Sequence, residues 1–435
     1  MDTNNKVTKT KKTKKTIKKS IYEKYNLKEL FELLETKEDD SSLQNIYKEI
    51  EKKIALSVKA EENPYETEQL VRGFLPLPDL RNKDFQKEIV NKKEFSIFTM
   101  EPLLENARKL HGEDKSFDEL VTLESKRLCN TFRLSNNQRF LKNFINPNTP
   151  YNSLLLFHGT GVGKTCSSVS IAETFLDNVS DNDIHVYVLL NPSIQDSFRK
   201  NIFDISKIKK NMTESQCTRD KYVKYMLQSG IDIKKNINKV KKQIDKKINS
   251  NYSFLGYRQF SNKIRNIERT IVSTRQDLST IEIKKLINER IRRMFSNSIF
   301  IIDEAHNIKE GQTDEKELTK YIEMVIKQSE NMKLILLSAT PMFNKNTEII
   351  YLLNLLLMNE KRPGITEKEI FRAEKLTEKG KKILNYKTQG LVSFLRGENP
   401  LRFPKKLYPS QEVLLKNYPS LTVANVPIEE NLLKE

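Results

Sequence analysis

The spacing of apolar residues changes along the chain, and the change falls near residue 131. Over residues 21–60, apolar positions recur mostly at three- and four-residue steps, which is typical of amphipathic helices. A Pro-rich break follows at 75–78, and scattered Leu and Phe among Lys and Glu then continue over 80–130. We therefore predict a helical accessory region over residues 21–130.

After residue 131, short apolar runs alternate with longer helical stretches. Four runs have the length and composition of buried strands, at residues 153–157, 184–190, 298–302 and 333–337. Strands separated by helices predict βαβ units and a parallel sheet that is covered on both faces. The sequence thus predicts an α/β domain over residues 131–360, followed by a C-terminal extension over 361–435.

A long segment, residues 204–295, separates the second strand from the third, and we predict that it is partly an insertion. Part of it has an apolar stripe at helical spacing, made by Ile233, Ile237, Val240 and Ile244. Lysines fill the other faces of this helix: Lys234, Lys235, Lys239, Lys241 and Lys242. A solvated helix face and a nucleic-acid contact are both open interpretations of these lysines.

Composition narrows the classes of partner. The formal net charge is +18, which favours nucleic acid, although AT-rich coding bias would also enrich lysine. Residues 1–20 are Lys- and Thr-rich and are expected not to fold. No apolar run reaches the roughly 18 residues of a membrane span, and the basic start of the sequence lacks the apolar core expected of a secretory signal peptide. Three cysteines without a CxxC pair argue against a disulfide framework and a structural zinc site, and indicate a reducing, intracellular compartment.

A glycine-rich segment follows the first strand directly and precedes a helix candidate that begins at Cys166. Strand, loop and helix in this order are what a phosphate-binding P-loop requires, whereas the segment alone would also fit a tight turn. Backbone N–H groups and the helix N-terminus would face the phosphates. Lys164 is expected to reach the β- and γ-phosphates of ATP, and Thr165 to bind Mg²⁺. The predicted ATP-binding residues are His158, Gly159, Thr160, Gly161, Val162, Gly163, Lys164 and Thr165.

An acidic pair, Asp303 and Glu304, ends the third strand. Ligands of open parallel sheets bind outside the carboxyl ends of the strands, so we expect this pair beside the P-loop. Asp303 is predicted to hold Mg²⁺, and Glu304 to be the catalytic base that orients and deprotonates the attacking water. The pair alone would also fit an acidic helix start, but the P-loop upstream favours the catalytic interpretation.

Together these motifs resemble the superfamily 2 helicases. Asp303-Glu304-Ala305-His306 is similar to motif II of the DEAH type, and Ser338-Ala339-Thr340 is similar to motif III, which couples hydrolysis to nucleic-acid binding. The resemblance implies a RecA-like P-loop fold and a helicase-type ATP hydrolase that uses ATP and Mg²⁺. It also implies coupling roles for His306, Ser338 and Thr340.

Two flanking segments extend this resemblance. Gln138, upstream of the P-loop, is similar to a family glutamine that reads the adenine or braces the P-loop. Asn191, Pro192 and Ser193 lie where motif Ia contacts the nucleic-acid backbone. The resemblance therefore implies a nucleic-acid partner, with DNA expected rather than RNA.

Three stretches are similar to the D-E-x-H ATPases of large cytoplasmic DNA viruses: residues 155–165, 338–344 and 394–409. That group includes the poxvirus nucleoside triphosphatase I and the small subunit of the early transcription factor, which use ATP during viral transcription. The resemblance implies a viral RNA polymerase as a partner, no membrane, and a location in the virion or the cytoplasmic virus factory.

The sequence departs from the family pattern in two places. His158 stands where many P-loops begin with glycine, so we expect it to be the last residue of its strand. No Q-x-x-G-R-x-x-R segment is present, although arginines of that motif in a second RecA domain reach the γ-phosphate. We expect that domain to lie on another polypeptide or in a longer form of the protein. The main alternative is a helicase half that acts as an interaction subunit. A nucleotide kinase is disfavoured, because such kinases lack both the DEAH and the Ser-Ala-Thr motifs.

Overall fold

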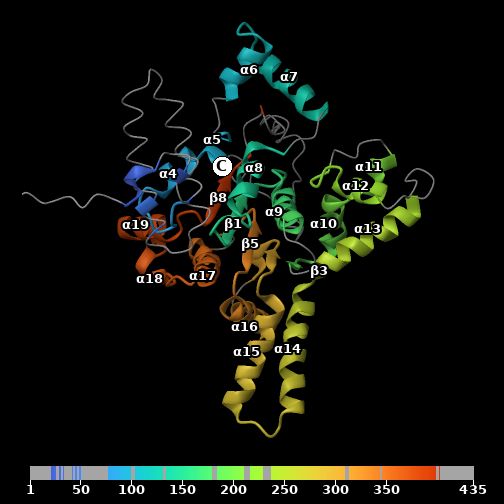
Figure 1. Ribbon diagram of the computed structural model, residues 1–435, viewed down its shortest axis with the longest axis vertical. Coiled ribbons are helices and arrows are strands. Elements are labelled where there is room, and N and C mark those ends of the chain that lie inside the picture. Colours follow the sequence, from blue (N-terminus) through green and yellow to red (C-terminus); the bar gives the residue numbers. More distant parts are fainter. Residues whose placement is uncertain are drawn as a thin grey trace, which may run out of the picture. The chain divides into compact units, whose positions relative to one another are not determined.

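Figure 1 presents the computed structural model of the chain. It describes residues 21–25, isolated positions between 29 and 49, and then 77–98, 103–130, 134–178, 184–209, 216–228, 237–308, 313–342, 345–397 and 401. Two compact units are distinguished, Met1–Pro78 with Lys87–Ile97, and Asp79–Gln86 with Phe98–Glu435. The predictions for residues 1–20, and for most of 26–76, concern residues outside those described.

The second unit is built on a six-stranded sheet in which every neighbouring pair of strands is parallel. The spatial order is β3-β2-β4-β5-β1-β8. The strands are β1 (Ser153–His158), β2 (Val186–Leu189), β3 (Tyr252–Leu255), β4 (Ile299–Ile302), β5 (Lys333–Ser338) and β8 (Val392–Leu395). The predicted α/β fold with a parallel sheet is therefore confirmed.

The four predicted strands are the inner strands of this sheet. Every residue of β2 and β4 is buried, as expected for parallel strands that are covered on both faces. The sequence pattern did not predict β3, which lies inside the expected insertion, or β8, which lies inside the expected C-terminal extension. Residues 79–86 and 98–130 belong to the same unit as the sheet, so the predicted boundary at residue 131 falls inside that unit.

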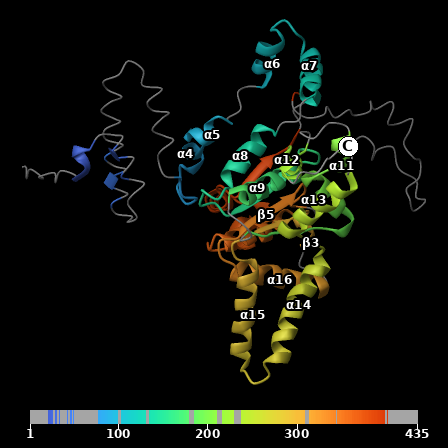
Figure 2. The same cartoon turned by 45° about the vertical axis from the view of Figure 1, so that its right-hand side comes forward.

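Helices cover the sheet on both faces. The connection from β1 to β2 runs one way across the sheet, and those from β3 to β4, β4 to β5 and β5 to β8 run the other way. Because such crossovers are right-handed, the helices of the two sets lie on opposite faces. Figure 2 agrees, with α8 and α9 on one side of the strands and α14, α15 and α16 on the other.

The helices on the same side of the sheet as α9 (Lys164–Asn178) are α8 (Asn136–Phe144), α10 (Gln195–Ile202), α11 (Ile205–Lys209), α12 (Lys221–Gln228) and α13 (Ile237–Asn251). Those of the opposite face are α14 (Tyr257–Thr274), α15 (Thr280–Phe295), α16 (Thr313–Gln328) and α17 (Ile349–Asn359). The remaining elements are η1 (Ile21–Lys24), α4 (Phe85–Asn91), α5 (Lys93–Ser96), α6 (Leu103–His111), α7 (Phe117–Asn130), η2 (Pro192–Ile194), η3 (Ala305–Asn307), η4 (Asn346–Glu348), α18 (Glu367–Ile370), β6 (Phe371–Arg372), β7 (Lys375–Leu376) and α19 (Glu378–Lys387). Among the described residues, no helix has both the length and the apolar character needed to cross a membrane.

The expected insertion contains two different structures. Helix α13 buries Val240, Ile244 and Ile248, which confirms the predicted apolar stripe there, while Lys239, Lys241 and Lys242 are exposed. Helices α14 and α15 form an antiparallel pair that extends away from the sheet (Figures 1 and 2). Ile233, Lys234 and Lys235 lie outside the described residues.

A buried carboxylate ties the insertion to the P-loop helix α9. Glu173 Oε1 accepts hydrogen bonds from the Tyr222 hydroxyl at 2.9 Å and the Tyr252 hydroxyl at 2.7 Å. Lys221 forms ion pairs with Glu173 and, at 2.6 Å, with Asp177. Burial, followed by the Glu173 charge, raises the pKa of both tyrosines, so each hydroxyl remains a donor. Several donors thus satisfy this buried carboxylate, as a polar group in the core requires.

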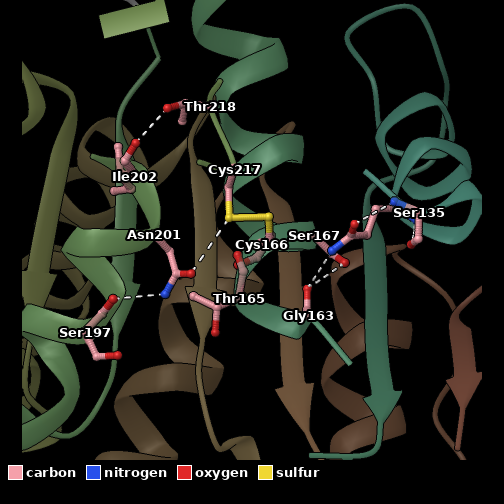
Figure 3. The surroundings of a disulfide bond; sticks show 12 residues. Ser135, Gly163, Thr165, Cys166, Ser167, Ser197, Asn201, Ile202, Cys217 and Thr218 are labelled. Carbon is pink, nitrogen blue, oxygen red and sulfur yellow. Dashed lines mark hydrogen bonds between the residues drawn. A yellow bond between two sulfur atoms is a disulfide. The ribbon is translucent and has the colours of Figure 1, made fainter. Parts of the chain in front are cut away.

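A disulfide joins the same two parts of the chain, which the sequence did not lead us to expect. Cys166, the third residue of α9, is bonded to Cys217, which precedes α12, and their Cα atoms are 5.3 Å apart (Figure 3). The sparse and odd cysteine count had argued against disulfides, and that interpretation is wrong for this pair. Spacing alone could not reveal it, because the two cysteines are 51 positions apart in the sequence.

We predict that oxidation of this pair stabilises the second unit. A cross-link over 51 residues restricts the unfolded chain and typically contributes about 2–4 kcal/mol. Guanidinium unfolding with and without reductant should differ for the wild type and coincide for Cys217→Ser, while Cys129→Ser should behave as the wild type. Three free thiols in the untreated protein, together with unfolding that is insensitive to reductant, would contradict the assignment.

Candidate ATP- and magnesium-binding site

The P-loop connects the end of β1 to the start of α9, as predicted. Residues 159–163 form the loop, and Lys164 is the first residue of the helix. The Lys164 ammonium donates hydrogen bonds to the carbonyl oxygens of His158, at 3.0 Å, and Gly159, at 3.1 Å. Burial lowers the pKa of Lys164, and the negative charges of Glu304 and Asp303 oppose that shift. The lysine therefore lies within the electrostatic field of the DEAH carboxylates.

Gln138 braces the loop from α8. Its side-chain amide donates to the carbonyl oxygen of Gly163 at 3.2 Å, while its side-chain oxygen accepts from the Ser135 N–H at 2.9 Å. The second bond belongs to a capping box that begins α8. The resemblance implied that this glutamine reads the adenine or braces the P-loop, and the hydrogen bond to Gly163 corresponds to the second role.

Gly163 permits that brace. Its φ is +87°, in the left-handed region, and a Cβ at this position would lie 2.5 Å from the Gln138 amide nitrogen. Both conditions favour glycine. The loop therefore depends on this residue for its backbone shape and for the approach of α8.

His158 ends β1, as predicted. The side chain is buried, and its Nε2 lies 2.9 Å from the Ser393 hydroxyl of β8. Burial, followed by the Lys164 charge, lowers the pKa of His158 to about 4, so the ring is neutral near pH 7. The structure thus holds this side chain against β8, and a contact of His158 with a nucleotide stays a prediction that only its backbone could fulfil.

The DEAH segment begins at the carboxyl end of β4. Asp303 is buried, whereas 40% of the Glu304 side chain is exposed. Glu304 adopts φ 49° and ψ 51°, a left-handed conformation that is uncommon for a residue with a side chain. Such conformations persist where surrounding structure enforces them, and they concentrate at functional sites. The exposed carboxylate is accessible to water, as a catalytic base must be.

Burial raises the pKa of Asp303 to about 6, and the neighbouring Glu304 charge adds to this effect. The Glu304 N–H, which donates to Asp303 Oδ1 at 3.0 Å, and the Lys164 charge act in the opposite direction. A buried carboxylate of this kind would be stabilised by a divalent cation. The cost of keeping it charged is consistent with a metal-binding role.

The donors present fit Mg²⁺ and a nucleotide. Within the described ranges, no group of three or more His, Cys, Asp or Glu side chains could hold a metal by itself. Mg²⁺ commonly takes only one or two protein carboxylates and fills its other positions with phosphate oxygens and water. The Asp303 carboxylate and the Thr165 hydroxyl would be sufficient protein ligands for Mg²⁺, with Lys164 beside the phosphates.

A hydrogen bond joins the DEAH segment to Ser-Ala-Thr. His306 Nδ1 lies 3.0 Å from the Ser338 hydroxyl at the end of β5, and 3.3 Å from Glu304 Oε2. The Ser338 hydroxyl also accepts from the Thr340 N–H at 3.1 Å. The three residues expected to couple hydrolysis to nucleic-acid binding are thus connected to one another and to Glu304.

Comparison with known families agrees with this geometry. Residues 126–343, half of the chain, match the family described as Type III restriction enzyme, res subunit. The matched stretch contains the P-loop, the DEAH segment and Ser-Ala-Thr. The chain belongs to this family. It therefore carries a helicase-type ATP-binding domain of superfamily 2, and the predicted helicase resemblance is confirmed at that level.

Several viral proteins are similar to this helicase-family chain. A protein of Acanthamoeba polyphaga mimivirus, provisionally named an ATP-dependent RNA helicase (L377), is 31% identical over 76% of the chain and 28% of its own length. A provisionally named helicase of Invertebrate iridescent virus 3 is 29% identical over 60% of the chain and 22% of its own length. The early transcription factor large subunit homolog of African swine fever virus is 22% identical over 78% of the chain and 35% of its own length.

The chain thus spans less than half the length of these relatives. The African swine fever virus relative is a large subunit homolog, whereas the motifs suggested the small subunit. The viral setting is therefore supported, and the choice between the two subunits stays a prediction.

The expected motif Ia residues follow β2, the strand that pairs with β4. Asn191, Pro192 and Ser193 are exposed, and the Asn191 side chain accepts from the Ser193 N–H at 3.1 Å. Their nucleic-acid contact stays a prediction. Tyr257, which the motif patterns did not single out, reaches the DEAH segment from α14. Its hydroxyl donates to the Asp303 carbonyl oxygen at 2.6 Å.

The pKa of Asp303 predicts a compromise between stability and function. The folded-state value of about 6 exceeds the ordinary 3.8, so the penalty is absent below about pH 4 and grows as the pH rises to about 6. Without nucleotide, the free energy of unfolding of Asp303→Asn should therefore exceed that of the wild type by about 2–3 kcal/mol near pH 7.5, as measured by denaturant titration. This difference should vanish near pH 4. It should also lose the extra stability that Mg²⁺-ATP gives the wild type. A wild type that is more stable than the variant near neutral pH without ligand would contradict this account.

Proposed function

We propose that this chain is the ATP-binding module of a DEAH-type, nucleic-acid-dependent ATPase, a helicase or translocase that serves viral transcription. The observation that carries the proposal is the grouping of Lys164, Asp303 and Glu304 at one edge of the sheet. The hydrogen bond from His306 to Ser338 supports coupling to a nucleic acid. The names of the viral relatives support the setting.

In this proposal each residue acts on a defined atom. Lys164 neutralises charge on the β- and γ-phosphates, while Thr165 and Asp303 would hold Mg²⁺, which would supply further neutralisation of the phosphoryl charge. Glu304 orients a water and accepts its proton. The water oxygen then bonds to the γ-phosphorus as the bond to the bridging oxygen of ADP breaks, releasing ADP and phosphate.

The partners proposed are nucleic acid, with DNA expected rather than RNA, and a second RecA domain or a viral RNA polymerase. The exposed loop 191–193 and the lysines of α13 support a nucleic-acid partner. An arginine equivalent to that of motif VI would come from outside these 435 residues. A catalytically weak helicase half acting as a subunit of a transcription complex is the second candidate, and the name of the African swine fever virus relative supports it.

Two substitutions test the proposed chemistry. Lys164→Ala should weaken Mg²⁺-ATP binding roughly tenfold to a hundredfold, because a charged phosphate contact contributes about 1.5–3 kcal/mol. Glu304→Gln should bind Mg²⁺-ATP within about twofold of the wild type, since it removes the base and preserves the side-chain size. Calorimetry measures both, and equal affinity in the wild type and Lys164→Ala would refute the phosphate site.

Steady-state turnover with single-stranded DNA and RNA separates the two candidates. The 435-residue chain should hydrolyse ATP very slowly, because an arginine finger contributes on the order of 10³–10⁵ in rate in related sites. A second RecA domain, supplied in cis or by a partner, should restore turnover, and Glu304→Gln should abolish the restored rate. Continued absence of turnover with that domain would favour the interaction subunit.

A further inference from the structure

A loop expected to contact nucleic acid and the catalytic segment meet at the start of α14. Gly256 and Tyr257 follow β3, the edge strand beside β2. The loop 191–193 follows β2, and the DEAH segment follows β4 on the other side of β2. The backbone joins the two strand ends, since the Leu190 N–H donates to the Leu255 carbonyl oxygen at 3.0 Å.

Gly256 packs against the loop. A Cβ at Gly256 would lie 3.1 Å from Pro192 Cγ, which is closer than side chains ordinarily approach. The Gly256 N–H also donates to the Gln259 side chain at 2.8 Å, which ties this position to the first turn of α14. A displacement of Pro192 toward Gly256 would therefore be transmitted to the first turn of α14.

Tyr257, the next residue, holds the DEAH backbone. Its hydroxyl lies 2.6 Å from the carbonyl oxygen of Asp303 and 3.4 Å from that of Glu304. The side chain of Asn307 also hydrogen-bonds this hydroxyl. One hydroxyl thus touches the two peptide groups that flank the left-handed Glu304 backbone, whose carboxylate is the proposed base.

We infer that Tyr257 is a positioning residue that couples nucleic-acid contact at 191–193 to the Asp303-Glu304 segment through Pro192 and Gly256. This inference rests on the proposed function. A strand bound at the loop shifts Pro192 against Gly256, and the Tyr257 hydroxyl carries the shift to the carbonyls beside Glu304. The route is separate from the link of His306 to Ser338, because it approaches the DEAH segment from the β3 side of the sheet.

The quantity to measure is the binding coupling between nucleotide and DNA, which is reciprocal and does not depend on turnover. The affinity of the full chain for a fluorescent ATP analogue with Mg²⁺ is determined alone and with saturating single-stranded oligothymidine. The ratio of the two affinities is the coupling factor, and the DNA affinity with and without nucleotide must give the same factor.

Tyr257→Phe removes one hydroxyl, and we expect the coupling factor to move toward one by about threefold to tenfold, the usual effect of a lost hydrogen bond. Each affinity measured alone should change less than twofold. Tyr321→Phe is the matched control, because its hydroxyl bonds Glu268 at 2.8 Å and Glu317 at 3.0 Å, away from the DEAH segment. It should lose stability in the same way but keep the wild-type coupling factor.

The outcomes distinguish the two claims. A wild type that fails to bind the ATP analogue or the DNA would overturn the proposed function. A wild type that binds both without coupling, or a Tyr257→Phe variant with the wild-type factor, would overturn the role of Tyr257 alone. An equal drop in Tyr257→Phe and Tyr321→Phe would also overturn it, because the effect would then be one of general stability.

Discussion

The parallel pairing of β4, β5 and β1 decides where the polar groups of the site lie. These strands run in one direction, with Ile302 opposite Leu336 and Leu156 opposite Leu337. The segments that follow them, which are the DEAH segment, Ser-Ala-Thr and the P-loop, therefore emerge at the same edge. Neighbouring strands lie only about 4.8 Å apart, so strand pairing alone brings together side chains that are distant in sequence. A change of register in any one strand would separate them.

The buried environment created by this sheet also sets the charges. Asp303 and Lys164 both lie where burial disfavours their ionised forms, and each is moderated by the other. Such a site is costly without a ligand and would be stabilised by a divalent cation and a polyphosphate. The P-loop helix is meanwhile braced at several positions, by Gln138 at its loop and by Cys217 and the Glu173 network along α9. Rigid support of this kind suits chemistry that depends mainly on positioning.

The sequence predicted the centre of the molecule better than its edges, and the reason is physical. Strands β2 and β4 are buried along their whole length and produce continuous apolar runs. The two missed strands, β3 and β8, are the edge strands, and each contains a serine and several half-buried positions. The hydrophobic signal of β3 and β8 is therefore weak, and only their pairing partners identify them.

The candidate site also contains residues that the sequence predicts and contacts that it does not. Local motifs predicted Lys164, Thr165 and the DEAH residues, because such chemistry constrains the spacing of residues along a strand and a turn. The disulfide partner of Cys166, the donors around Glu173 and the contact of Tyr257 with Asp303 depend on segments far apart in the chain. No periodicity encodes those contacts, so they become visible only when the chain is folded.

The most direct test of the account is an experimental structure of the chain with a non-hydrolysable ATP analogue and Mn²⁺, whose anomalous scattering locates the metal. The account predicts phosphates against the backbone amides of residues 159–165, Lys164 beside the terminal phosphates, and the metal between Thr165 and Asp303. A nucleotide bound elsewhere, or a metal that contacts neither Thr165 nor Asp303, would contradict it.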